Sequence, residues 1–166
     1  IEDKMNLEHD IQEAGVQMIL LVEDSIRFYS SILPNLYNYI LEQSKNFSQE
    51  ALNRHAATMR MRGRPKVVLA RTYEEAQKLY DKYSDNTLGV ISEARFPLKS
   101  AAKAFGNEVM PEEKPKHRTD TFGREKCPDA GLQLFRYIRK NDPFVPLIIE
   151  SSESENRAKA EAEGFR

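Results

Sequence analysis

The chain has 166 residues, 40% of them apolar and 31% charged, and its 25 lysines and arginines nearly balance 26 aspartates and glutamates. This composition predicts one globular domain with a sizeable core, and the near-zero net charge gives no general attraction to nucleic acid or anionic membranes. No apolar run approaches the roughly 20 residues of a membrane helix. The single cysteine, Cys127, excludes an internal disulfide. We therefore expect a cytoplasmic protein that binds neither membrane nor nucleic acid.

Strand and helix patterns alternate along the chain. Residues 1–15 are polar and predict a lead-in helix or tail, and residues 16–166 form the predicted domain. The predicted strands are the apolar runs 16–22, 66–70, 88–92 and 145–150, whose length and apolar character are typical of buried parallel strands. Apolar residues at helical spacing follow each of them. The predicted helices cover 26–41, 48–57, 73–83, 128–138 and 152–164.

Local signals mark several helix boundaries. Thr72 with Glu75, and Ser152 with Glu155, have the spacing of capping boxes. Ser48 is a candidate N-cap for the second helix, and Pro34 predicts a kink or break in the first. Residues 98–127 are polar and contain several prolines and glycines, so we expect a mobile insertion there. The alternation as a whole predicts an α/β domain with helices on both faces of a parallel sheet.

Polar side chains follow the strands at the edge where such sheets bind ligands. Glu23 and Asp24 come after the first strand, Glu93 after the third, and Ser151 after the fourth. Carboxylates that lie close together repel each other, and a hard cation such as Mg²⁺ with oxygen ligands relieves that repulsion. A hydroxyl such as that of Ser151 can then hydrogen-bond a phosphoryl group. The alternative for each acidic residue is an ordinary N-cap of the following helix.

Three of these segments resemble parts of response-regulator receiver domains. Met18–Ser25 resembles the first strand with its acidic residues, Leu88–Glu93 the third strand, and Val145–Ser152 the fourth strand with its switch hydroxyl. The segment 16–166 also resembles receiver-like modules attached to phosphoenolpyruvate synthase or pyruvate phosphate dikinase-like chains. The phrases that carry this second resemblance are Val22–Ser31, Ala70–Ala76 and Ile91–Pro97.

The resemblance implies a three-layer flavodoxin-like fold with the strand order 2-1-3-4 and a missing or truncated fifth strand. It implies Asp24 as the main Mg²⁺ ligand, Glu23 as a helper acting through water, and Ser151 as the switch hydroxyl. Glu93 takes the position of the phosphorylated aspartate, where its extra methylene displaces the carboxylate from the in-line geometry of phosphoryl transfer. The family's fifth strand carries a lysine, and the residues at the end of this chain, Phe165 and Arg166, do not supply it. We expect either that the chain is cut short there or that another segment completes the sheet.

These features predict a regulatory domain in phosphorelay-type signal transduction, a pseudo-receiver that is not itself catalytic. Its expected partners are another protein or other domains of the same chain. One alternative is an acceptor that remains active through Glu93 or a nearby serine. A second is an assembly domain that forms a homodimer through the edge of the fourth strand or the long first helix. A third is the regulatory part of a phosphotransferase resembling phosphoenolpyruvate synthase.

Overall fold

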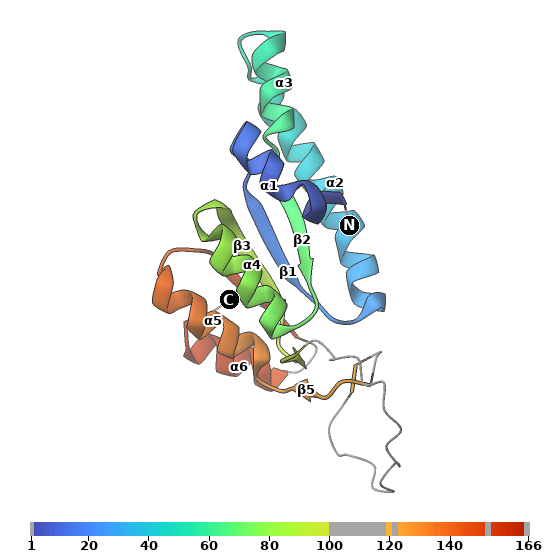
Figure 1. The fold of residues 1–166 in the computed structure, drawn as a ribbon, viewed down its shortest axis with the longest axis vertical. Helices are drawn as coiled ribbons and strands as arrows, with labels where there is room; N and C mark the ends of the chain where they lie inside the picture. The colour runs from blue at the N-terminus through green and yellow to red at the C-terminus, as the bar shows by residue number, and fades with distance from the viewer. Residues whose placement is uncertain (1, 100–118, 121–122, 152–153, 165–166) are drawn as a thin grey trace, which may run out of the picture.

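The centre of the fold is a four-stranded parallel sheet with the order β2-β1-β3-β6 (Figure 1). This computed structural model describes residues 2–99, 119–120, 123–151 and 154–164. The expected order 2-1-3-4 is confirmed, because β6 is the fourth strand of this sheet. The strands are β1 (Met18–Val22), β2 (Lys66–Ala70), β3 (Thr87–Glu93) and β6 (Leu147–Glu150).

Helices cover both faces of the sheet, which gives the three layers of a flavodoxin-like α/β fold. On one face, α4 (Tyr73–Tyr83), α5 (Ala130–Asn141) and α6 (Ser154–Ala162) contribute to the larger apolar cluster. On the other face, α2 (Ile26–Gln49) packs against β1 and β2. Among the described helices α2 alone contributes to this second cluster. The neighbouring β6 residue on that face, Ile148, is 50% exposed.

The first helix, α1 (Glu2–Ala14), packs against the sheet domain. Leu7 is fully buried in the larger apolar cluster. Asp3 and Asp10 lie 3.4 and 3.1 Å from the Nζ atom of Lys66 at the start of β2. A helix is one of the two forms predicted for residues 1–15, and the domain boundary at residue 16 stays a prediction.

The region after β1 differs from the sequence-based expectation. Pro34 lies inside α2, which continues to Gln49 as one helix, so of the predicted kink or break the break is wrong and the kink stays a prediction. The next helix, α3 (Arg54–Arg62), is capped by Asn53, whose side chain accepts a hydrogen bond from the Ala56 backbone N–H at 2.8 Å. The predicted cap at Ser48 is wrong as well, because this residue lies within α2. The far ends of α2 and α3 extend together past the sheet (Figure 1).

The first capping box is confirmed, because the Thr72 hydroxyl accepts a hydrogen bond from the Glu75 backbone N–H. The second involves residues 152–153, which lie outside the described residues. A short 3₁₀ turn, η1 (Ser84–Asn86), joins α4 to β3. No helix in the described part of the chain is long and apolar enough to cross a membrane.

Most of the predicted insertion 98–127 also lies outside the described residues. Its described part returns to the domain as β5 (Lys126–Cys127), which pairs antiparallel with β4 (Phe96–Pro97). These two short strands form a ribbon at the carboxyl edge of the main sheet (Figure 1), at the opposite end of the molecule from α3.

Candidate functional site

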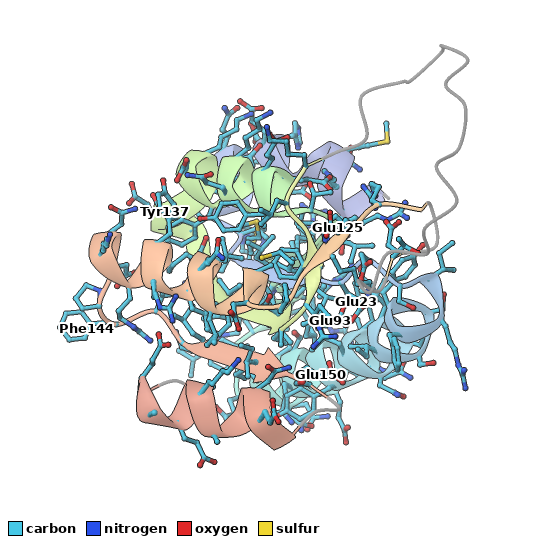
Figure 2. The ribbon with its side chains drawn as sticks, turned by 90° about the horizontal axis from the view of Figure 1, so that it is seen from below. Glu23, Glu93, Glu125, Tyr137, Phe144 and Glu150 are labelled. Atoms are coloured by element: carbon cyan, nitrogen blue, oxygen red, sulfur yellow. The ribbon has the colours of Figure 1, made fainter. Side chains whose placement is uncertain are left out.

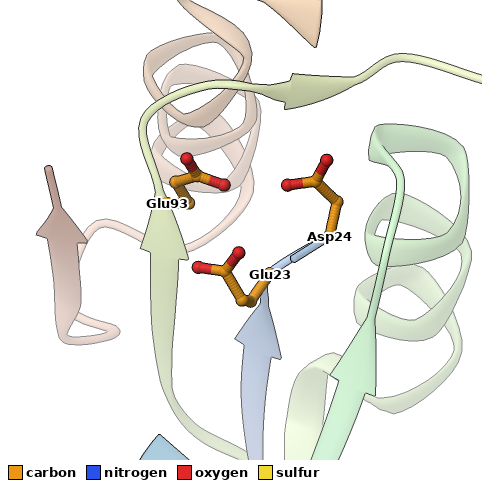
Figure 3. Close-up of side chains that lie close together, drawn as sticks. All are labelled: Glu23, Asp24 and Glu93. Atoms are coloured by element: carbon orange, nitrogen blue, oxygen red, sulfur yellow. The ribbon is translucent and has the colours of Figure 1, made fainter. Parts of the chain in front are cut away.

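The carboxyl groups of Glu23, Asp24 and Glu93 lie together at one edge of the sheet (Figure 3). β1 and β3 are adjacent and parallel, and Val22 is level with Ser92, so the residues that follow them emerge side by side. One oxygen from each of the three carboxyl groups lies within 4.8 Å of the other two. The structure thus brings together all three acidic residues that the sequence predicts for this edge.

These acids are withdrawn from solvent. Asp24 is fully buried, Glu23 is 3% exposed, and the Glu93 side chain is 22% exposed. Glu23 accepts a hydrogen bond from the Ser25 backbone N–H at 2.9 Å. Oδ2 of Asp24 and Oε2 of Glu93 are buried and have no hydrogen-bond partner among the described residues. Buried acceptors without a partner are costly, so this cluster is suited to binding a proton or a cation.

The electrostatics of the cluster favour a proton on Glu93 when no metal ion is bound. Burial, together with repulsion from Glu23 and the nearby carboxylate of Asp24, raises the pKa of Glu93 to about 9. Burial also raises the pKa of Glu23. Because a bound divalent cation favours the charged forms, it would compete with these protons.

A lysine that the sequence patterns did not predict for this site reaches the pocket. The Nζ atom of Lys126 lies 2.7 Å from Oδ1 of Asp24 and 3.6 Å from Oε2 of Glu93. Burial by itself would lower the pKa of Lys126, but its hydrogen bond to Asp24 and the acidic side chains around it outweigh burial and raise it. Lys126 is therefore charged at neutral pH and serves as a counterion to the carboxylates.

The pairing of β4 with β5 positions Lys126 at the acidic pocket. Phe96 of β4 is fully buried and pairs with Cys127, which fixes the neighbouring Lys126 beside the strand ends. Directly after this ribbon, the start of α5 packs on the end of β3, where the Gly131 backbone N–H donates to the Ala94 carbonyl at 3.0 Å. A methyl group at Gly131 would lie 2.5 Å from the Glu93 carbonyl oxygen, so only glycine permits this approach.

A cavity of about 560 Å³ opens above the acidic cluster and extends toward β6. Glu150 lines it and is the β6 partner of Glu93, next to which Figure 2 shows it. Ser151, the predicted switch hydroxyl, lines the same cavity. Its Oγ accepts a hydrogen bond from Nδ2 of Asn156, at 2.9 Å. Asn156 is 5% exposed, and a polar residue this buried on α6 is a site feature that periodicity alone does not reveal.

The donor set fits a hard divalent cation. Asp24 and Glu93 each present a buried oxygen without a hydrogen-bond partner among the described residues, and Glu23 stands beside them. Mg²⁺ takes oxygen ligands and keeps several waters, for which the adjoining cavity has room. Asp24 and Glu93 are therefore the candidate direct ligands. Glu23, which already accepts a backbone hydrogen bond, is suited to a contact through water.

Comparison with known proteins gives limited similarity. No family model matches the chain, and no curated protein matches it. Among solved structures, the chain is similar to a response regulator receiver domain protein from Clostridium thermocellum. The two share 17% sequence identity with a TM-score of 0.44, over 90% of this chain and 78% of the other.

Proposed function

We propose that this chain is a receiver-like regulatory domain of phosphorelay-type signal transduction in which Glu93 stands at the phosphoacceptor position. The observation that carries the proposal is the convergence of Glu23, Asp24 and Glu93 at the carboxyl ends of β1 and β3. It is supported by the sheet order β2-β1-β3-β6, which sets these strands side by side. The cavity beside them is large enough for a phosphoryl group.

Each residue has a distinct part in this proposal. Asp24 and Glu93 hold Mg²⁺ directly, and Glu23 assists through water. The cation supplies charge neutralisation for oxygens of a bound anionic group. Glu93 carries one more methylene than aspartate, so its carboxylate enters the pocket further and is displaced from the position of in-line attack. Ser151 lines the same cavity and acts as the switch hydroxyl.

The proposed output is a contact with another protein or with other domains of the same chain. Regulation would depend on the charge state of the pocket rather than on transfer of a phosphoryl group to Glu93. A narrower form of the proposal is a regulatory part of a phosphotransferase similar to phosphoenolpyruvate synthase. The sequence phrases that resemble such modules support it.

Phosphorylation of a restored acceptor tests the proposal. The wild type and Glu93→Asp are incubated with a small-molecule phosphodonor and Mg²⁺, and intact mass is measured. The proposal predicts no adduct on the wild type and one phosphoryl group on Glu93→Asp. Glu150→Asp is the matched control, because Glu150 is the β6 neighbour of Glu93, and it should stay unmodified. An adduct on the wild type would show an active acceptor, and no adduct on Glu93→Asp would count against a receiver site.

A second candidate function is an assembly domain, and the β6 edge favours it. β6 ends the sheet among the described strands. Ile148 within β6 is 50% exposed, and Phe144 just before it is 90% exposed and lies at the periphery in Figure 2. An exposed strand edge with apolar neighbours invites pairing with another chain. This candidate predicts a concentration-dependent dimer in sedimentation velocity that Ile148→Lys dissociates, whereas a monomer at all concentrations would exclude self-assembly.

A further inference from the structure

The cation that occupies the acidic pocket in this structure is the ammonium group of the chain's own Lys126. Its Nζ atom lies 2.7 Å from Oδ1 of Asp24, and the Lys126 side chain is only 13% exposed. Asp24 is at the same time the fully buried member of the acidic cluster, and its other oxygen lacks a hydrogen-bond partner among the described residues. One carboxylate therefore serves both the internal counterion and the candidate metal site.

We propose that Lys126 and a divalent cation exchange at Asp24, so that binding of the metal ion releases β5 from the pocket. This inference rests on the cation-binding pocket of the proposed function and adds a mechanism that regulates it. It assigns the described part of the insertion a role as an internal competitor for the metal site.

The geometry argues against simultaneous occupancy. A divalent ion ligated by Asp24 and Glu93 would lie about 2.1 Å from their oxygens. The Lys126 ammonium already contacts the same two carboxyl groups, at 2.7 and 3.6 Å. The two cations would then lie within a few ångströms of each other in a pocket with little solvent, where repulsion between like charges is strong. Moving the lysine side chain out relieves that repulsion.

The attachment of Lys126 makes this exchange a structural event. β4 and β5 pair over only two positions, Phe96 with Cys127 and Pro97 with Lys126. Pro97 has no backbone N–H to donate, and a two-stranded ribbon is marginally stable in isolation. The ion pair with Asp24 therefore contributes to the attachment of β5 to the sheet. Its loss changes the position of the segment that leads directly into α5.

The chain contains its own reporter for this movement. Cys127 is the only cysteine, follows Lys126 directly and is half-buried against the larger apolar cluster. The rate at which N-ethylmaleimide alkylates Cys127 is measured with chelator and with saturating Mn²⁺. The exchange predicts an increase of at least fivefold in the wild type on adding Mn²⁺. In Lys126→Met the rate should be high in both conditions. An unchanged wild-type rate, with Mn²⁺ binding verified by electron paramagnetic resonance, overturns the proposal without any variant.

Direct binding separates this proposal from the function on which it rests. Mn²⁺ affinity is measured for the wild type, for Lys126→Met and for Lys99→Met, which removes an exposed lysine just beyond β4. The exchange predicts at least tenfold tighter binding by Lys126→Met and no change for Lys99→Met. Equal or weaker binding by Lys126→Met overturns the exchange alone and leaves the cation pocket in place. Absence of binding in all three proteins overturns both the exchange and the cation pocket.

Discussion

The Nζ atom of Lys126 lies 2.7 Å from Oδ1 of Asp24, although the two residues are 102 positions apart in the chain. This ion pair joins the end of β1 to the short strand β5 and supplies positive charge to a cluster of three buried or half-buried carboxyl groups. The balance between these charges leads to testable consequences for stability and for binding.

The ionisation of Glu93 should make stability depend on pH. The pKa of Glu93 is raised from 4.5 to about 9 in the folded chain, so the folded state holds an extra proton across that range. The free energy of unfolding without metal should therefore fall as pH rises from about 4.5 toward about 9. Glu93→Gln should flatten this dependence and raise the free energy of unfolding near pH 8 by about 1–3 kcal/mol.

Urea unfolding in the presence of a chelator, at several pH values, measures this effect. Glu150→Gln is the control, because it removes an exposed carboxylate from the adjacent strand end. Equal pH slopes for the wild type and Glu93→Gln would mean that Glu93 is charged in the folded protein throughout this range.

Two tyrosines on opposite faces of the sheet should respond differently to loss of their hydroxyl group. The Tyr80 hydroxyl is buried without a hydrogen-bond partner among the described residues, whereas that of Tyr37 donates to Oδ2 of Asp3 at 2.7 Å. Tyr80→Phe should change the free energy of unfolding by less than about 0.5 kcal/mol or increase it, and Tyr37→Phe should lower it by about 1–2 kcal/mol. Urea unfolding distinguishes them, and a larger loss for Tyr80→Phe would reveal a hydrogen bond there.

The contact between α5 and β3 should depend on Gly131. Alanine is normally more favourable than glycine in a helix, but a Cβ atom here would lie 2.5 Å from the Glu93 carbonyl oxygen and 3.1 Å from the Ala94 Cα atom. Gly131→Ala should therefore destabilise the fold by about 1–3 kcal/mol and disturb the acidic cluster. At Gly89 the closest atom would be 3.4 Å away, so Gly89→Ala is a milder control. Stabilisation by Gly131→Ala, measured by thermal unfolding, would contradict this packing.

The packing of α1 can be tested within one helix. Leu7 is fully buried in the larger apolar cluster, whereas Met5 is 78% exposed. Leu7→Ala should lower the free energy of unfolding by about 2–5 kcal/mol, and Met5→Ala should change it by less than about 0.5 kcal/mol. Similar small effects from both variants in urea unfolding would mean that α1 is a detachable lead-in rather than part of the folded unit.

Much of the sheet and of the acidic cluster could be predicted because each depends on a local pattern. An apolar run followed by an acidic residue specifies both a buried strand and a side chain at its carboxyl end, as with Val22 and Glu23. The N-cap at Thr72 could be predicted in the same way, because its partner Glu75 is only three residues away in the sequence. Neighbouring parallel strands then bring these chain segments together at one edge.

The remaining features depend on long-range packing that local patterns do not encode. Lys126 reaches Asp24 only because two two-residue strands pair, and the polar composition around them predicted an insertion without such a role. Pro34 was expected to kink or break the helix after the first strand, but α2 continues past it, because a helix that packs along a sheet can accommodate a proline within it. Tertiary contacts outweighed the local signals in both places.

The most direct test of the cation pocket is a crystal structure of the chain grown with Mn²⁺, with the ion located by its anomalous scattering. We expect an ion about 2.1 Å from oxygens of Asp24 and Glu93. We also expect that the Lys126 ammonium no longer contacts Asp24. Electron density that shows Lys126 still bound to Asp24, with no ion at the acidic cluster, would contradict the presence of a cation pocket there.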